Sequence, residues 1–292
     1  MESFAFKQFT VSHAKSAMKV NTDGVLLAAW VNLPSSTPPD IPGEKLQINE
    51  IGTCPQVILD IGTGTGVISL ILAQRFSESI PLGAEIKITG IDIDPLSIED
   101  AGDNFRVSPW RDLLECEAIS LQEYLKRENC SEKFSLIISN PPYFTNSLKS
   151  PSQRRSAARH NDSLPLHILI QSAAQTLKKD GVLALILPVE EGKKAISFAE
   201  ENLLSLNRLC RIKTTSQKSE KRYLLEFIKT GKSSNGNSNK NSNPIANADM
   251  AIEELIIQNI DGTYTEQYCN IVSKYYSKNL RKAVQKVKIP LP

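Results

Sequence analysis

The sequence predicts an α/β protein built on a doubly wound, mostly parallel β-sheet, and three observations carry this prediction. The first is V-I-L-D-I-G-T-G-T-G-V at 57–67, where an apolar run typical of a buried strand leads into glycines and then a helical pattern. The second is that strand and helix patterns alternate from there to about residue 204. The third is a pair of strand patterns at 209–215 and 222–230, which predicts a hairpin and one antiparallel strand.

Composition sets limits on the class of protein. The chain has 292 residues, of which 40% are hydrophobic and 23% charged, enough for one large α/β domain with additions or for two small domains. No apolar run approaches the ~18–20 residues that span a bilayer, and the N-terminal segment lacks the apolar core of a signal peptide. The five cysteines are odd in number and form no C-x-x-C pair. We therefore expect a cytoplasmic protein with reduced thiols and no membrane partner.

Metal binding is not expected from the residue types present. The chain has three histidines, and none stands with the partners that a closed zinc site needs. The formal net charge of +2 is too small to indicate a nucleic-acid partner by itself. The sequence does not fix the oligomeric state.

Glycines at 62, 64 and 66 follow the first strand pattern, directly after Asp60. Glycine accepts a positive φ and lets a ligand approach the backbone closely, and the helix that follows offers free N–H groups to a carboxylate or phosphate. The spacing is neither the G-x-G-x-x-G dinucleotide fingerprint nor a lysine-containing P-loop. The turn therefore indicates a binding crevice, although a purely structural glycine turn is the alternative.

A second acid stands at the tip of the next strand pattern, E-I-K-I-T-G-I-D-I-D-P at 85–95. A carboxylate in this place can accept hydrogen bonds from both hydroxyls of a ribose. We assign this role to Asp92, with Asp94 in reserve. An acid here could instead cap the helix pattern that begins at Leu96.

The third strand is expected near 116–120, and a further strand pattern, at 133–139, runs into Asn140, Pro141 and Pro142. Proline cannot donate to a sheet ladder, so the strand ends at Asn140. A rigid turn without function would look the same. The order of strand, Asn, Pro, Pro and the aromatic Tyr143, three elements after the glycine turn, is nevertheless a specific combination.

Both motifs resemble those of known enzymes. D-I-G-T-G-T-G at 60–66 resembles the first motif of class I S-adenosylmethionine-dependent methyltransferases, and N-P-P-Y at 140–143 resembles the motif of those that methylate planar amino nitrogens. Three flanking segments resemble the bacterial tRNA adenine-N6 methyltransferases, which modify the adenosine beside the anticodon of a valine tRNA. They are F-K-Q-F…M-K-V-N-T-D-G at 6–24, the Arg159-His160 pair, and Y-T-E-Q-Y at 264–268.

The resemblance implies a Rossmann-like, seven-stranded sheet with one antiparallel strand, and S-adenosylmethionine as cofactor. The acid and glycine turn would face the methionine end of that cofactor, Ser120 stands where the family commonly has an acid that holds the adenine amino group, and Leu121 would lie against the ring. The expected cofactor residues are Asn21, Thr22, Asp23, Gly24, Asp60, Gly62, Gly64, Gly66, Asp92, Ser120, Leu121 and Asn140.

The expected catalytic residues are Asn140, Pro141, Pro142 and Tyr143. The Asn140 side-chain oxygen and the Pro141 carbonyl would each accept one N–H of the target amine, and Tyr143 would stack on the target base. Basic stretches without acids are the expected RNA contacts, although a solvated surface is an equal alternative. Their residues are Lys149, Arg154, Arg155, Arg159, Lys278, Arg281 and Lys282.

We expect a single methyltransferase domain over 1–292. It would comprise an N-terminal extension and connection at 1–55, a catalytic core at 56–230, a disordered Asn/Ser-rich insertion at 231–248, and a C-terminal strand with a basic helix at 249–292.

The predicted function is N6-methylation of an adenosine in the anticodon loop of tRNA. Two alternatives stay open: a glutamine-N5 methyltransferase of peptide-release factors, which also uses N-P-P-Y, and a non-catalytic RNA-binding module on the same fold. The first would usually carry a helical substrate domain ahead of the core, where this chain has about 55 residues. The intact motif residues argue against the second.

Overall fold

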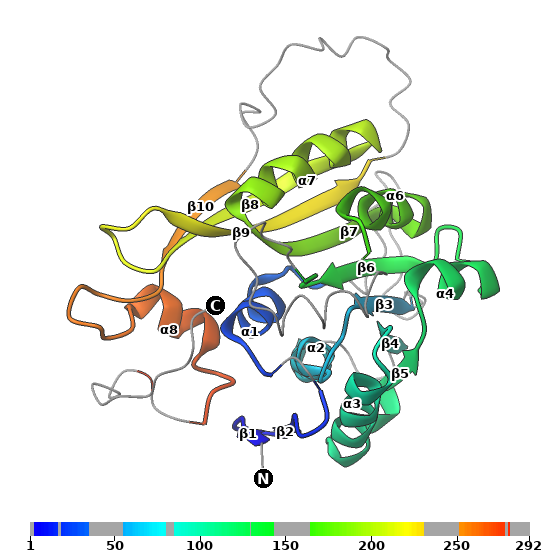
Figure 1. Cartoon of the computed structure of the whole chain (residues 1–292), viewed down its shortest axis with the longest axis horizontal. Coiled ribbons are helices and arrows are strands. Elements are labelled where there is room, and N and C mark those ends of the chain that lie inside the picture. The colour runs from blue at the N-terminus through cyan, green and yellow to red at the C-terminus, as the bar shows by residue number, and fades with distance from the viewer. Residues whose placement is uncertain are drawn as a thin grey trace, which may run out of the picture.

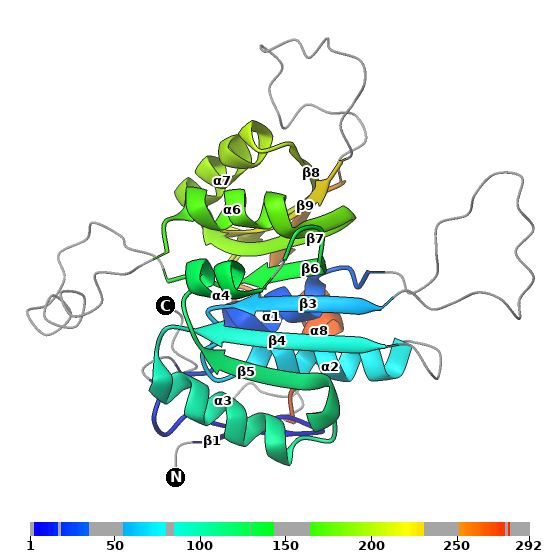
Figure 2. The ribbon, with the colours of Figure 1, turned by 90° about the vertical axis from the view of Figure 1, so that its right-hand side faces the viewer.

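The computed structural model describes residues 3–16, 19–34, 55–79, 85–128, 130–142, 164–230, 251–277 and 280. Among these residues, eight strands form one central sheet (Figures 1 and 2). They are β3 (Gln56–Ile61), β4 (Ile86–Asp92), β5 (Leu114–Ala118), β6 (Phe134–Ser139), β7 (Leu177–Pro188), β8 (Leu204–Lys213), β9 (Glu220–Lys229) and β10 (Ala251–Ile256).

The strand order is β10-β8-β9-β7-β6-β3-β4-β5. Every neighbouring pair is parallel except the two pairs made by β9, which runs antiparallel to both β7 and β8. From β3 the chain proceeds to β4 and β5 on one side, and β6 then starts the other half of the sheet. The predicted doubly wound, mostly parallel sheet with one antiparallel strand is confirmed, and the switch point lies between β3 and β6.

The expectation of seven strands is wrong for this sheet, because β10 adds an eighth. It pairs in parallel along the free edge of β8, from Ala251 opposite Arg208 to Ile256 opposite Lys213. Leu255 becomes completely buried there. The gain from burying that side chain and pairing an otherwise open edge explains why the short strand joins the sheet.

Helices cover both faces of the sheet (Figure 1). One apolar cluster joins one face to α1 (Thr22–Trp30), α2 (Val67–Ser79), α3 (Pro95–Val107) and α8 (Glu266–Val272). The other cluster joins the opposite face to α4 (Leu121–Arg127), α6 (Leu166–Thr176) and α7 (Val189–Glu201). A short 3-10 helix, η1 (Arg111–Leu113), precedes β5.

The apolar run that follows Gln56 is explained by this double cover. Ile58 belongs to the first cluster and Leu59 to the second, since successive strand residues point to opposite faces. A strand buried on both faces needs apolar residues at nearly every position. No helix within the described ranges is long and apolar enough to cross a membrane.

The N-terminal segment packs on the α2 side of the sheet. A small antiparallel hairpin, β1 (Ser3–Ala5) with β2 (Thr10–Ser12), precedes α1. Phe6 stacks on Phe9 at 4.6 Å between ring centroids and forms a β-bridge with Tyr276. The segment leading into α1 and the residues after α8 therefore form one packed unit with the core.

Candidate active site

The predicted motif residues come together at the carboxyl edge of the sheet. The glycine turn follows β3, Asp92 ends β4, and Asn140 follows β6. The register of strand pairing aligns these three strand ends, because Asp60 lies opposite Gly90 of β4 and opposite Ile138 of β6. This edge, at the switch point between β3 and β6, is where doubly wound sheets bind their ligands.

The three glycines all adopt positive φ, at 71° for Gly62, 56° for Gly64 and 79° for Gly66. They differ in what a side chain would meet. A Cβ on Gly62 or Gly64 would have no neighbour within 4 Å among the described residues, whereas one on Gly66 would lie 2.4 Å from the Phe105 ring. Gly66 therefore lets α3 pack against the turn, while Gly62 and Gly64 leave space above the backbone for a ligand.

Asp60 is completely buried beneath this turn. Its Oδ2 accepts hydrogen bonds from Thr63 Oγ1 at 2.8 Å and Ser69 Oγ at 2.7 Å, but its Oδ1 has no partner within the described part of the chain. Burial, together with the nearby charge of Asp92, raises the pKa of Asp60 to about 6. An unpaired buried carboxylate oxygen is costly, and a cationic ligand above the turn would explain its retention.

Binding of a cationic cofactor is expected to strengthen as the pH rises through about 6, because Asp60 is then ionised and attracts the cation. Below that range Asp60 takes up a proton, and binding must displace it. Calorimetric titration of the cofactor across this range measures the effect. Asp60→Asn should flatten the rise, and an unchanged profile in that variant would assign the pH dependence to another group.

Asp92 and Asp94 make different hydrogen bonds. Asp94 is the N-cap of α3 and accepts from the backbone of Leu96 and Ser97. Asp92 instead accepts from the Gly64 N–H at 3.0 Å and the Asp94 N–H at 3.0 Å. Burial raises the pKa of Asp92, and these two backbone N–H groups oppose the shift. Asp92 thus lies against the glycine turn, and its contact with a ribose stays a prediction.

Asp92→Ala is expected to weaken cofactor binding by about 1–3 kcal/mol, the usual cost of leaving polar partners unpaired. Calorimetry with S-adenosylmethionine or its demethylated product measures this loss. Asp94→Asn is the matched control, because it keeps the α3 cap and should bind nearly as the wild type does. Equal losses in the two variants would contradict the separate roles.

Asn21 brings the N-terminal segment to the catalytic motif. It caps α1 by accepting the Gly24 N–H at 2.8 Å, and it also accepts a hydrogen bond from Asn140 Nδ2 at 3.4 Å. A Cβ on Gly24 would lie 3.5 Å from Ile68, at the start of α2. Asn21 and Gly24 therefore lie between the start of α2 and Asn140.

Thr22 and Asp23 make contacts that fix α1 against the rest of the protein. Thr22 is 7% exposed, and the Asp23 carboxylate pairs with Arg222 of β9 at 3.0 Å. Because that charge is already matched, Asp23 anchors the helix to the sheet. Its predicted cofactor contact stays a prediction.

Three buried polar residues on α3 were missed by the sequence analysis. Asn104 accepts from Ser12 N at 2.8 Å and donates to the Thr65 carbonyl at 3.0 Å, so it ties the N-terminal segment to the glycine turn. Asp100 accepts the N–H groups of both Lys15 and Ser16, and Ser97 contacts the Ser16 hydroxyl. Polar residues on the buried face of an amphipathic helix were the available signal.

Ser120 and Leu121 lie at the start of α4. Ser120 forms a capping box with Glu123, accepting that residue's N–H while its hydroxyl donates to Glu123 Oε2 at 2.6 Å. Leu121 is 5% exposed in the apolar cluster, which leaves it little surface for a ring, whereas Ile93 beside Asp92 is 45% exposed. Ile93 is therefore an exposed apolar side chain directly after the strand-tip acid. The adenine contacts of Ser120 and Leu121 stay predictions.

Several predicted residues lie outside the described ranges. These are Tyr143 of the catalytic motif and the whole RNA-binding set: Lys149, Arg154, Arg155, Arg159, Lys278, Arg281 and Lys282. The Asn/Ser-rich insertion at 231–248 also lies outside them. Their predicted roles stay predictions.

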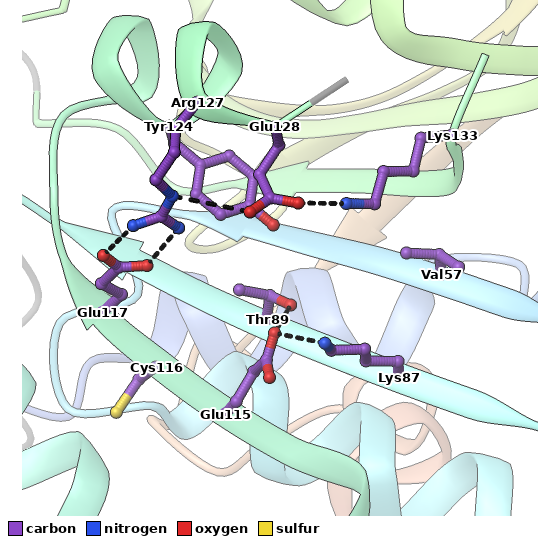
Figure 3. A pocket seen from close by; sticks show the side chains of 10 residues that line it. All are labelled: Val57, Lys87, Thr89, Glu115, Cys116, Glu117, Tyr124, Arg127, Glu128 and Lys133. Atoms are coloured by element: carbon purple, nitrogen blue, oxygen red, sulfur yellow. Dashed lines mark hydrogen bonds and ion pairs between the residues drawn. The ribbon is translucent and has the colours of Figure 1, made fainter. Parts of the chain in front are cut away.

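A pocket of about 330 Å³ lies away from this edge, against the starting halves of β3 and β4 (Figure 3). Its cations are matched by its acids: Lys87 pairs with Glu115, Arg127 with Glu117, and Lys133 with Glu128. With these charges satisfied, nothing at this pocket points to a ligand. The candidate site is therefore the set of motif residues at the carboxyl edge of the sheet.

The residues at that edge fit S-adenosylmethionine better than a nucleotide phosphate. The start of α2 favours a carboxylate, Asp60 and Asp92 favour a cation, and Asp92 can accept ribose hydroxyls. One ligand with a carboxylate, an ammonium, a sulfonium and a ribose satisfies all of these.

Comparison with known proteins agrees with this geometry. A family model described as a methyltransferase domain matches residues 56–242. A protein of Christiangramia forsetii named tRNA1(Val) (adenine(37)-N6)-methyltransferase is 34% identical, over 95% of this chain and 98% of that protein. One of the same name from Flavobacterium psychrophilum is 36% identical, over 94% and 99%. The chain belongs to the tRNA1(Val) (adenine(37)-N6)-methyltransferase family.

Membership in this family confirms the predicted resemblance, and it identifies the chain as an enzyme, a methyltransferase that uses S-adenosylmethionine. A solved structure, a predicted O-methyltransferase from Agrobacterium tumefaciens, superposes with a TM-score of 0.57 at 15% identity. That match covers 87% of this chain and 96% of the other. It confirms the class I methyltransferase fold.

Proposed function

We propose that this protein methylates N6 of the adenosine beside the anticodon of a valine tRNA, the position that its relatives' name gives as 37. One observation carries the proposal from fold to reaction. Asn140 and Pro141 lie at the end of β6, beside the glycine turn and Asp92, where an acceptor amine would meet the cofactor.

The reaction is an in-line displacement for which S-adenosylmethionine supplies a methyl group on a sulfonium. The adenine amine is a poor nucleophile because its lone pair is delocalised into the ring. Asn140 Oδ1 and the Pro141 carbonyl would each accept one N–H, which draws the nitrogen toward tetrahedral geometry and aims its lone pair. The carbon–sulfur bond breaks as the nitrogen–carbon bond forms.

No ionised general base is needed, because the methylated nitrogen is acidic and loses its proton readily to water. The two consecutive prolines restrict the backbone and hold the Pro141 carbonyl in place before the substrate arrives. Tyr143 would stack on the adenine once the base leaves its loop. The chain's own contribution is therefore positioning and fixed hydrogen-bond acceptors.

The relatives favour tRNA over a release factor as the substrate. The two quoted above carry a tRNA methyltransferase name and match at least 94% of this chain, so the match includes the flanks as well as the shared N-P-P-Y motif. Motif residues held at one edge also argue against a module without turnover. We further propose a cytoplasmic enzyme of one methyltransferase domain with the predicted subdivisions, whose partner is tRNA rather than a membrane or a metal ion.

Binding of tRNA is expected to weaken steeply as salt increases, because the basic stretches would displace counterions from phosphates. Removing one phosphate contact, as in Arg155→Ala, should flatten the slope of log affinity against log salt by up to about one unit. Filter binding with unmodified tRNA at several salt concentrations measures this. If the slope of log affinity against log salt is unchanged in variants of both basic stretches, these stretches do not contact phosphates and are solvated surface.

Nucleoside mass spectrometry of tRNA tests the proposed function in the cell. In a strain that lacks this gene, N6-methyladenosine should disappear from valine tRNA and return when the gene is restored. Retention of the modification in the deletion strain would refute the proposal.

A further inference from the structure

The Asn21 side-chain oxygen is shared between two donors. It accepts the backbone N–H of Gly24 at 2.8 Å and the side-chain Nδ2 of Asn140 at 3.4 Å. The backbone N–H is a donor that cannot exchange roles, so the atom of Asn21 that faces it must be the oxygen. That oxygen then requires a donor from Asn140, which can only be its amide nitrogen.

We propose that Asn21 is a positioning residue that sets which end of the Asn140 amide faces the substrate. This inference rests on the proposed function of Asn140 as an acceptor for the target amine. With the amide nitrogen held by Asn21, the amide oxygen points away from Asn21. The Gly24 N–H at the α1 N-terminus thus orients the Asn21 amide, and the Asn21 amide in turn orients the Asn140 amide.

The orientation matters because the two ends of an asparagine amide have nearly the same shape and opposite hydrogen-bonding character. An adenine amine offers N–H donors. If the Asn140 amide turned over, its NH2 group would face those donors. The adenine amine would then lose one of the two hydrogen-bond acceptors that orient its lone pair. A device that disfavours the turned-over state therefore acts on the rate of transfer and not on cofactor affinity.

The α1 helix holds Asn21 in a defined place at both of its ends. Near the N-terminus, Asp23 pairs with Arg222 at 3.0 Å. At the C-terminus, Arg75 Nη1 donates to the carbonyls of Ala28 and Val31, at 2.7 Å each. These contacts tie α1 to β9 and to α2, so Asn21 is positioned relative to the glycine turn.

Two substitutions separate this role from helix capping and from cofactor binding. Asn21→Ser keeps a good N-cap, but its side chain is too short to reach Asn140. Asn21→Asp keeps both the cap and an acceptor of the right length. A third variant, Thr265→Ala, removes the N-cap of α8 and controls for the loss of a helix cap elsewhere.

We expect Asn21→Ser to lower kcat for tRNA methylation by about 2- to 12-fold, the ratio that corresponds to one lost hydrogen bond. Cofactor affinity is measured by calorimetry in parallel, because the resemblance also implies a contact between Asn21 and the cofactor. Asn21→Asp should recover most of the lost kcat, and Thr265→Ala should not change kcat. An unchanged kcat in Asn21→Ser, or a loss of cofactor affinity that accounts for the change, would overturn the inference.

A spectroscopic readout keeps the inference separate from the proposed function, because it needs no substrate. The Asn140 side-chain NH2 signals in ¹H–¹⁵N spectra can be assigned by their absence in Asn140→Asp. They should move in Asn21→Ser and keep a hydrogen-bonded shift in Asn21→Asp. Unmoved signals in Asn21→Ser would overturn the orientation role, whereas a wild-type enzyme inactive on tRNA with the expected shifts would overturn only the proposed function.

Discussion

Asn140→Ala is expected to reduce methyl transfer by about 10²–10³, the usual effect of removing a preorganised hydrogen-bonding group from an active site. Cofactor affinity should stay close to wild type, because the proposed contacts of Asn140 are to the acceptor amine. The measurements are single-turnover methylation of unmodified tRNA and calorimetric cofactor binding.

The structure supplies a control for this variant. Asn140 Nδ2 donates to Asn21, so alanine also removes a contact within the protein, and thermal unfolding should be compared with that of Asn21→Ser. A stable Asn140→Ala enzyme that methylates at close to the wild-type rate would show that Asn140 only forms a turn.

Gly64→Ala and Gly66→Ala lie two residues apart but are expected to have different main effects. Gly64→Ala should mainly reduce cofactor affinity, and Gly66→Ala should mainly reduce stability. Each pays about 1–2 kcal/mol for a side chain in the left-handed region. A Cβ on Gly66 also meets the Phe105 ring at 2.4 Å, and overpacking of this kind adds about 1–3 kcal/mol. Gly66→Ala should therefore lose more stability than Gly64→Ala.

A Cβ on Gly64 would meet no atom of the residues that the structure describes within 4 Å, so it would project into the space proposed for the cofactor. Gly64→Ala should lose only about 1–2 kcal/mol of stability, the cost of left-handed strain, but its cofactor affinity should fall tenfold or more, a loss of about 1.4 kcal/mol or greater. Urea unfolding and calorimetry on both variants measure the two effects. Equal losses of stability, with equal cofactor affinities, would contradict the assignment of open space above Gly64.

The parts of the site that follow directly from a strand could be predicted from the sequence. Asp60, Asp92 and Asn140 each stand at a strand end, and parallel strands bring their carboxyl ends to one edge. The different hydrogen bonds of Asp92 and Asp94 could be seen only in the structure. A strand tip and a helix cap two residues apart look alike in sequence.

Contacts between distant segments were beyond sequence reasoning. Asn104 binds Ser12 across 92 positions, and Asp100 binds Lys15 across 85. No periodicity indicates which buried polar side chain will meet which backbone N–H. The C-terminal strand was predicted, but its place as an eighth strand of the main sheet was not, since a short strand pattern does not say whether it extends that sheet.

The most direct test of the account is the transfer of a labelled methyl group by the purified protein. Unmodified valine tRNA, a release factor and S-adenosylmethionine labelled in its methyl group are incubated together with the enzyme. The products are then digested and analysed by mass spectrometry. We predict label on N6-methyladenosine in the anticodon-loop fragment, at the adenosine beside the anticodon. Label on a glutamine amide of the release factor, with none in the tRNA, would contradict the account.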